Sequence, residues 1–271
     1  MNITFIGGGN MASALIAGLA GKLTARENIH VVDPNAEALQ RLASQYGVTT
    51  APAVDQQVGA SEVLVLAVKP QQMREVAASL LPHLAAARPL VLSIAAGIRA
   101  ADLSRWLGGY GAIVRCMPNT PALIGMGITG MVAMAGVSDE QKRAADSILQ
   151  AVGKTVWLDD EAMIDPVTAV SGSGPAYVFY FLEAMQQAAL ELGLSAAQGR
   201  ELALATFAGA AQLAAQSPDP VEVLRQRVTS KGGTTHAAIA SMEQAGVKQA
   251  IVEAIKAAAA RGRELGDELG A

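Results

Sequence analysis

The first half of the chain alternates short apolar runs with helix-like segments, and this alternation limits the folds available to it. The apolar runs, rich in Val, Ile and Leu, cover residues 2–6, 29–33, 62–68, 89–95 and 111–117. Helix-like segments lie between them, at residues 10–21, 35–46, 70–81 and 99–107. Apolar strands separated by helices are typical of a parallel sheet covered on both faces. Further strands are expected at 127–136 and 154–160, so the pattern predicts a doubly wound α/β domain over residues 1–160.

The sequence pattern changes after about residue 160, where the apolar runs typical of strands end. Alanine- and leucine-rich segments follow at residues 175–193, 195–216, 220–228, 232–245 and 247–269. Gly193, Ser217-Pro218 and Gly246 separate them, as helix ends do. Hydrophobic residues make up 51% of the chain but aromatic residues only 4%, so these helices carry much small apolar surface. We predict an all-α C-terminal domain over residues 161–271 that packs partly against a partner chain.

Charge and cysteine content exclude several classes of function. The net charge is −4 and no dense basic run exists, so we expect no nucleic-acid partner. The single cysteine and three widely spaced histidines do not predict a metal site. The chain has no apolar stretch of about 18 residues and its first residues do not resemble a signal peptide. We therefore expect a cytoplasmic protein without a membrane partner.

A glycine motif follows the first expected strand. Gly7, Gly9 and Ala12 fit the pattern G-x-G-x-x-G/A between a strand and a helix, which is the context of a dinucleotide-binding loop. Gly7 permits a tight turn, and Gly9 lets the backbone approach a pyrophosphate. The helix that begins at Asn10 and Met11 would face the phosphates with free N–H groups. This motif makes the predicted domain Rossmann-type, the alternative being an ordinary turn.

Asp33 ends the second expected strand. An acidic residue there commonly binds the ribose hydroxyls of the adenosine and repels a 2′-phosphate, which favours NADH. The alternative is that Asp33 turns away and the sequence DPN only caps the next helix. Asn35 offers an amide to a phosphate in that case. The cofactor therefore stays open between NADPH and NADH.

Three more strand ends carry polar or proline-marked loops, AVKPQ, SIAAG and MPNTPA. Ligands of open α/β sheets lie outside the carboxyl ends of the strands, so these loops are expected to surround the cofactor. The candidate cofactor-binding residues in them are Ala67, Val68, Lys69, Pro70, Ala95, Ala96 and Asn119. Lys69, Asn119 and Thr120 are their polar members.

A second candidate site interrupts the helical half with the sequence VTSKGGTTHA. Thr229 or Ser230 is expected to cap the following helix, and two glycines leave backbone N–H groups uncovered. The segment predicts a cradle for a carboxylate or phosphate, and the hydroxyl of Thr235 can donate and accept a hydrogen bond. The alternative is a tight turn between two helices. The cradle residues are Gly232, Gly233, Thr234 and Thr235.

The stretch VTSKGGTTHAAIASME, together with the upstream PVEVL, resembles the signature of the pyrroline-5-carboxylate reductase family. The blocks FIGGGNMASAL, AVKPQ, SIAAGI, VRCMPNTPALIG and AVSGSGPAYVF also resemble family blocks in family order, so the resemblance covers nearly the whole chain. It implies the reduction of 1-pyrroline-5-carboxylate to L-proline with NADPH or NADH, the last step of proline biosynthesis. It also implies a helical domain that interlocks with a second chain in a homodimer, and in several members a decamer.

The resemblance also suggests roles for the cradle. The amides of Gly232, Gly233 and Thr234 would hold the substrate carboxylate, and Thr235 would hydrogen-bond the ring nitrogen. Ser230 would shape the cradle, so Thr235 and Ser230 are the candidate catalytic residues. Catalysis would then be mostly positioning of an iminium ion for hydride transfer.

Two other functions share parts of the pattern. β-Hydroxyacid dehydrogenases resemble the chain at GGGNM but use a lysine on the helix after a glycine-rich segment, and residues 174–193 contain none. A redox sensor that binds a dinucleotide would use its helical half only for oligomerisation. Such a sensor would need the glycine loop but not the sequence SKGGTT.

Overall fold

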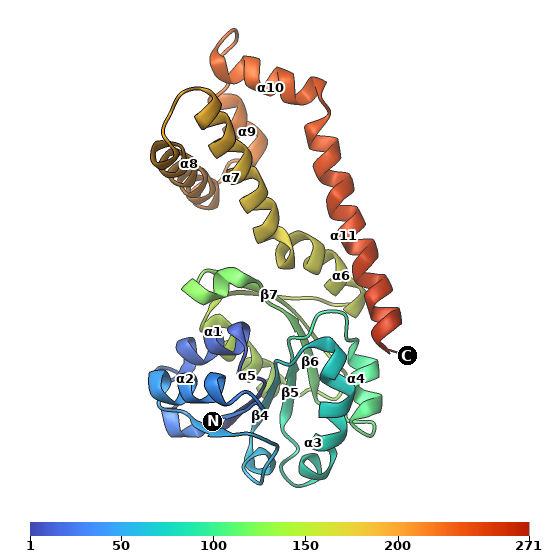
Figure 1. The fold of residues 1–271 in the computed structure, drawn as a ribbon. Coiled ribbons are helices and arrows are strands. Elements are labelled where there is room, and N and C mark those ends of the chain that lie inside the picture. The colour runs from blue at the N-terminus through green and yellow to red at the C-terminus, as the bar shows by residue number, and fades with distance from the viewer. Residues whose placement is uncertain (271) are drawn as a thin grey trace. The chain divides into compact units, whose positions relative to one another are not determined.

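The computed structural model describes residues 1–270, apart from the side chains of residues 85–87. Within these residues the strands form one eight-stranded sheet of order β3-β2-β1-β4-β5-β6-β7-β8 (Figure 1). The strands are β1 (Ile3–Ile6), β2 (Ile29–Val32), β3 (Thr49–Ala51), β4 (Val63–Leu66), β5 (Leu90–Ser93), β6 (Ile113–Met117), β7 (Gly127–Ala133) and β8 (Gly153–Trp157). The predicted α/β fold is confirmed.

The sheet is parallel from β3 to β6, and the sequence predicts this arrangement for β2, β1, β4, β5 and β6. β7 runs antiparallel to β6, and β8 runs parallel to β7. The connection between β6 and β7 explains the reversal, because it is only a short 3₁₀ turn, Thr120–Ile124. A parallel crossover needs a connection of about a dozen residues or more.

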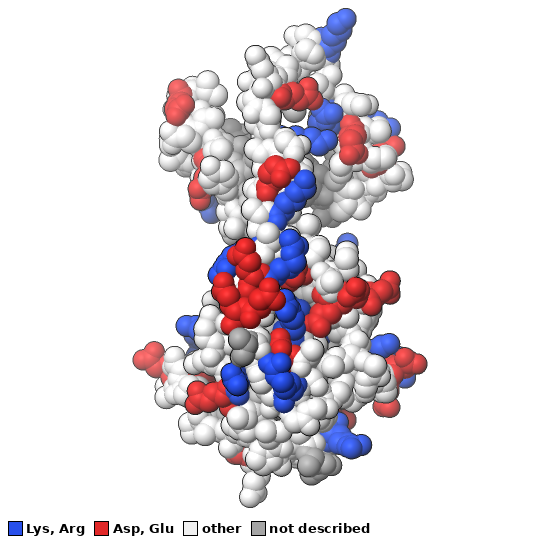
Figure 2. Space-filling model, turned by 90° about the vertical axis from the view of Figure 1, so that its right-hand side faces the viewer, with Lys and Arg blue, Asp and Glu red and all other residues white. Residues whose placement is uncertain are grey.

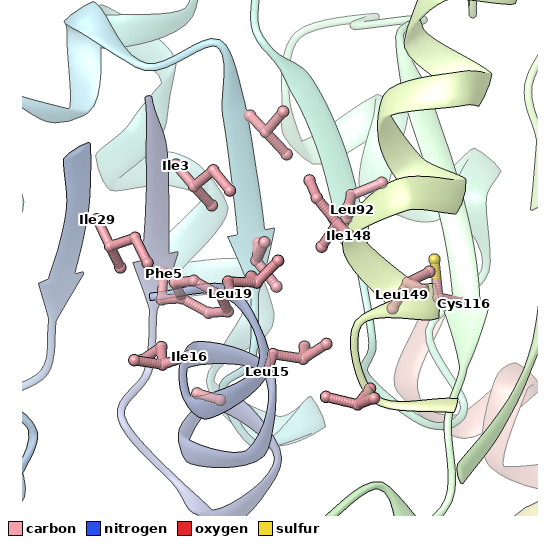
Figure 3. Packing of buried hydrophobic residues seen from close by; sticks show 14 of the residues in the cluster. Ile3, Phe5, Leu15, Ile16, Leu19, Ile29, Leu92, Cys116, Ile148 and Leu149 are labelled. Carbon is pink, nitrogen blue, oxygen red and sulfur yellow. The ribbon is translucent and has the colours of Figure 1, made fainter. Parts of the chain in front are cut away.

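Helices cover both faces of the sheet. One face packs against α1 (Asn10–Leu19), α2 (Ala36–Tyr46) and α5 (Asp139–Gln150). The other packs against α3 (Met73–Ala87) and α4 (Ala100–Trp106). Figure 3 shows the first core, where Leu15, Ile16 and Leu19 of α1 lie over Phe5 of β1 and Ile148 of α5 contributes from the side. Burying these aliphatic side chains provides the main stabilisation of the domain.

Local signals fix the ends of these helices. The side chain of Asn35 caps α2 by accepting the N–H groups of Glu37 and Ala38, and Gly47 ends the helix in the left-handed conformation. Ser138 begins α5 with a reciprocal capping box. β3 was not predicted, because its three residues are too short and too polar to stand out.

Residues 161–172, where no element was predicted, form a chain of short helical turns. They are a 3₁₀ turn (Glu161–Met163), α6 (Ile164–Val167) and a π-helical turn (Thr168–Gly172). Further 3₁₀ turns lie at Arg26–Asn28, Val58–Ala60 and Pro70–Gln72. π-Helical turns are rare and occur often near functional sites.

The remaining helices are α7 (Gly174–Glu191), α8 (Ala196–Gln216), α9 (Val221–Arg227), α10 (Thr234–Gln244) and α11 (Val247–Gly270). By its contacts the chain divides into two compact units. The first comprises Met1–Ser173 together with the C-terminal stretch from Ala257, and the second comprises Gly174–Lys256. The division of function at residues 160 and 161 stays a prediction.

The second unit buries little apolar surface of its own. In α7 and α8 only Leu182, Gly199 and Ala203 are buried among the described residues, and α9 and α10 bury none. Large apolar side chains on α7 and α8 are exposed, among them Phe179, Tyr180, Leu202 and Leu213. Exposed apolar side chains that gather on neighbouring helices indicate an interaction surface. No helix in the described part of the chain has the length and apolarity to cross a membrane.

Candidate functional site

The glycine loop between β1 and α1 needs glycine at its first position. Gly7 has a φ of 103°, and its N–H donates to the carbonyl of Val32 at 2.8 Å. A Cβ atom at Gly7 would lie 2.6 Å from the carbonyl oxygen of Ala67. Both the conformation and the close approach of the backbone after β4 therefore exclude a side chain here.

Gly9 differs, because the packing of the protein does not require glycine there. It is the N-cap residue of α1 in an extended conformation, and no described side chain caps the helix. A Cβ atom at Gly9 would meet no atom within 4 Å. The exposed backbone of Gly9 and Asn10 thus offers free N–H groups and open space at a helix N-terminus. This arrangement fits the pyrophosphate of a dinucleotide.

Asp33 faces the glycine loop and is not turned away. Its Oδ2 accepts a hydrogen bond from the N–H of Gly8 at 2.6 Å, and its Oδ1 accepts one from the N–H of Asn35 at 2.8 Å. The capping role in DPN belongs to Asn35. The carboxylate of Asp33 therefore braces the glycine loop, and its contact with a ribose stays a prediction.

The other predicted cofactor loops leave the same edge of the sheet, because β1, β4, β5 and β6 are parallel neighbours. The N–H of Ala67 donates to Ile6 and that of Ile94 donates to Leu66, which ties each loop to the adjacent strand. Ala95 is buried and Ala96 is exposed. The exposed or half-buried members of the loop after β4 are Ala67, Val68, Lys69 and Pro70.

Asn119 has a structural role that the sequence did not reveal. Its Oδ1 accepts the N–H of Ile128 at 3.0 Å, and its Nδ2 donates to the carbonyl of Ser171 at 3.1 Å. The side chain is buried and joins the end of β6 to β7 and to the π-helical turn. Both ends of its amide are thus engaged within the protein. Thr120, the next residue, is exposed.

A buried ion pair beneath these loops was also missed. Arg115 of β6 is 4% exposed and donates to Oε1 of Glu161 at 2.8 Å. The same carboxylate oxygen accepts the N–H of Ala100 at 2.7 Å, at the first residue of α4. Asp165 lies 4.0 Å from the other end of the guanidinium. The available signal was a charged residue inside the apolar run IVRCM.

In the second unit, the sequence SKGGTT forms the turn into α10. The expectation that Thr229 or Ser230 caps this helix is wrong. Gly233 is the N-cap residue and no described side chain caps α10. The hydroxyl of Thr229 instead donates to the carbonyl of Arg225 at 2.6 Å, at the end of α9. The carbonyl of Ser230 accepts the N–H of Gly233 at 3.0 Å.

The consequence is an uncapped helix N-terminus with small, exposed residues. Gly232 has a φ of 77°, and a Cβ atom there would meet nothing within 4 Å. Ser230, Thr234 and Thr235 are exposed. The N–H groups in the first turn of α10 have no partner within the helix, so the turn suits an anionic group. The N–H of Gly233 is already used inside the turn.

Comparisons with known proteins give matches to both regions of the chain. Residues 161–265 match the family described as pyrroline-5-carboxylate reductase dimerisation. Residues 2–97 match the family described as NADP oxidoreductase coenzyme F420-dependent. The pyrroline-5-carboxylate reductase of Pseudomonas aeruginosa is 46% identical over 99% of this chain and 98% of its own length. That of Haemophilus influenzae is 42% identical over 97% of each chain.

Solved structures agree with this relationship. A pyrroline-5-carboxylate reductase from Coxiella burnetii superposes with a TM-score of 0.91 at 40% identity, covering 97% of this chain and 98% of that chain. The pyrroline carboxylate reductase of Plasmodium falciparum, solved with NADP bound, gives 0.88 at 28% identity and covers 98% of each chain. The chain described here belongs to the pyrroline-5-carboxylate reductase family.

Proposed function

We infer that this chain reduces 1-pyrroline-5-carboxylate to L-proline with NADPH or NADH, the last step of proline biosynthesis. The observation that carries this inference is the 46% identity to a pyrroline-5-carboxylate reductase over 99% of the chain. The similarity thus includes both the glycine loop and the SKGGTT turn. A sensor that used its helical half only for assembly would not need that turn.

In our proposal the first unit binds the dinucleotide. The N–H groups at the start of α1 would hold the pyrophosphate beside Gly9. The exposed backbone of Ala96 and the loop after β4 would line the rest of the cofactor site. Asp33 keeps the glycine loop in shape through Gly8, and its charge would disfavour a 2′-phosphate. When bound, the reduced nicotinamide supplies the hydride.

In the second unit, we assign the substrate carboxylate to the N-terminus of α10. The backbone around Gly232 and Thr234 would hold it, and Ser230 would shape the turn. The hydroxyl of Thr235 would hydrogen-bond the imine nitrogen and orient the C=N bond. A protonated imine is electron-poor at carbon, so binding and orientation account for most of the catalysis.

The assembly follows from the exposed apolar surface of the second unit. The match to a dimerisation family and this surface support a homodimer through α7 and α8. The alternative in our proposal is a decamer built from such dimers. We place the enzyme in the cytoplasm, as expected for an enzyme of amino-acid biosynthesis.

The test is formation of the product. The protein is incubated with 1-pyrroline-5-carboxylate and either NADPH or NADH, and proline is measured by mass spectrometry while cofactor oxidation is followed by absorbance. Proline formation equal to cofactor oxidation supports the function. A protein that binds cofactor but forms no proline would overturn it. The ratio of kcat/KM for the two cofactors tests Asp33, because a strong preference for NADPH contradicts its role against the 2′-phosphate.

A further inference from the structure

The loop between β5 and α4 rests on the last turns of α11, within the first unit. Gly97 of this loop has a φ of 74°, and a Cβ atom there would lie 3.1 Å from Cδ1 of Leu269 and 3.3 Å from Cβ of Leu265. Leu269 also packs against the core cluster that contains Ala95. The end of α11 thus packs directly against Gly97, the residue that follows Ala96.

Charged side chains link the C-terminal end of α11 to α4. Arg99 precedes α4 and donates from Nη2 to Oδ1 of Asp267 at 2.7 Å and to the carbonyl of Arg263 at 3.3 Å. One and a half turns along α4, Arg105 donates to the carbonyl of Gly270. Figure 2 shows basic and acidic side chains gathered on the face where α4 and the end of α11 lie.

Two glycines of α11 make these contacts possible. A Cβ atom at Gly266 would lie 3.0 Å from Nε and Nη2 of Arg99, so the guanidinium lies directly on the helix backbone there. Gly270 lies in the same way against the carboxylate of Asp102. The spacing of four residues places both glycines on one face of the helix.

We propose that Arg99 and Asp267 are positioning residues for cofactor binding. They hold the end of α11 against α4 and so fix residues 95–97 in the conformation that lines the nicotinamide site. This inference rests on the proposed function, because it takes Ala95 and Ala96 as cofactor-binding residues. Neither Arg99 nor Asp267 has to touch the cofactor.

The exposure of the pair distinguishes positioning from general stabilisation. The side chain of Asp267 is 72% exposed and that of Arg99 is 40% exposed. Exposed ion pairs contribute little to the free energy of unfolding. Local order in a loop can change without a change in global stability. Loss of the pair should therefore appear in cofactor affinity and not in thermal unfolding.

The experiment compares Asp267→Ala with Glu264→Ala in the full chain. Glu264 lies on the same helix, is also exposed, and pairs with Arg261 of that helix, so both variants remove one carboxylate from α11. The Kd for NADPH is measured by fluorescence, together with the KM of each substrate, kcat and the thermal midpoint. We expect Asp267→Ala to raise the Kd and the KM for NADPH about two- to fivefold.

We expect three quantities of Asp267→Ala to equal those of the wild type. They are kcat at saturating NADPH, the KM for the imine and the thermal midpoint. Glu264→Ala should leave every parameter unchanged, and Asp267→Glu should recover part of the affinity. Arg99→Ala should weaken NADPH binding as much alone as together with Asp267→Ala, because the two residues act as one unit.

Two results would overturn the inference. One is an unchanged Kd for NADPH in Asp267→Ala. The other is a joint fall of kcat, of both affinities and of the thermal midpoint, which would give the pair a purely structural role. If the wild type binds NADPH but does not reduce the imine, the proposed function fails instead. The comparison of Kd values then still decides whether Arg99 and Asp267 position the cofactor loop.

Discussion

At the scale of single residues, two glycines of one loop lack a side chain for different physical reasons. Gly7 is required by the fold, because its positive φ and the nearby carbonyl of Ala67 exclude a side chain. Gly9 has open space around it, so its lack of a side chain matters only when a ligand approaches. The two substitutions should therefore separate folding from binding.

We predict that Gly7→Ala lowers the free energy of unfolding by about 1–3 kcal/mol. We predict that Gly9→Ala keeps wild-type stability but weakens NADPH binding about tenfold, because its methyl group occupies the space of the pyrophosphate. Urea unfolding and fluorescence titration with NADPH measure the two effects. Unchanged NADPH affinity in Gly9→Ala would remove the pyrophosphate from this place.

Cys116 illustrates a residue whose surroundings suppress its chemistry. It is 1% exposed in the core beneath α1 and α5, and burial raises the pKa of its thiol. The reactive thiolate is therefore disfavoured. We predict no labelling by a maleimide reagent in the native protein and one label per chain in denaturant, measured by mass spectrometry. Rapid labelling of the native protein would contradict this packing.

At the scale of elements, Asn119 joins three pieces of chain through one amide. Asn119→Ala would leave the N–H of Ile128 and the carbonyl of Ser171 without their partner. Fully buried polar groups without a partner cost about 1–3 kcal/mol each. Ile128 and Ser171 are half-buried, so we predict a loss of about 1–2 kcal/mol in the free energy of unfolding. Thr120→Ala, at the exposed neighbour, is the control for urea unfolding. Equal stability of the two variants would contradict the structural role.

The elements that the sequence predicts well are those whose signal is local. The run ITFI and the glycines after it indicate β1 and its turn, because apolar β-branched residues and glycine act within a few positions. The direction of β7 was not predictable from its own residues, since it depends on the length of the connection from β6. The sequence misassigned the cap of α10 because the hydroxyl of Thr229 hydrogen-bonds the carbonyl of Arg225 in the preceding helix. Such a local bond competes with helix capping, and the sequence alone does not show which of the two forms.

In the candidate site, too, the sequence predicts the features with a local signal and not those that depend on distant residues. Gly7, Gly9 and the SKGGTT turn were found because glycine and hydroxyl residues stand out in apolar surroundings. Asp33 contacts Gly8, which is 25 positions away in the sequence. Arg99 contacts Asp267, which is 168 positions away. No local pattern reports such pairs. They become visible only when the strands and helices are placed in space.

At the scale of the whole molecule, the second unit needs a partner to cover its apolar helices. We predict a mass of two or ten times 27.8 kDa by light scattering. Phe179→Asp should raise the dissociation constant of the dimer at least about a hundredfold, because it places a charge in an apolar interface. Leu23→Asp, at an exposed leucine of the first unit, should leave the mass unchanged. A monomeric wild type would contradict the proposed assembly.

The most direct test of the account is turnover of 1-pyrroline-5-carboxylate by the wild type, Thr235→Ala and Thr235→Ser. NADPH oxidation and proline formation are measured together, with the Kd for NADPH as a control for the cofactor site. We predict that the wild type forms proline, that Thr235→Ala loses about a hundredfold in kcat with unchanged NADPH affinity, and that Thr235→Ser keeps much of the rate. Full activity of Thr235→Ala would contradict the assignment of the cradle at the start of α10. A wild type that binds NADPH without forming proline would contradict the function itself.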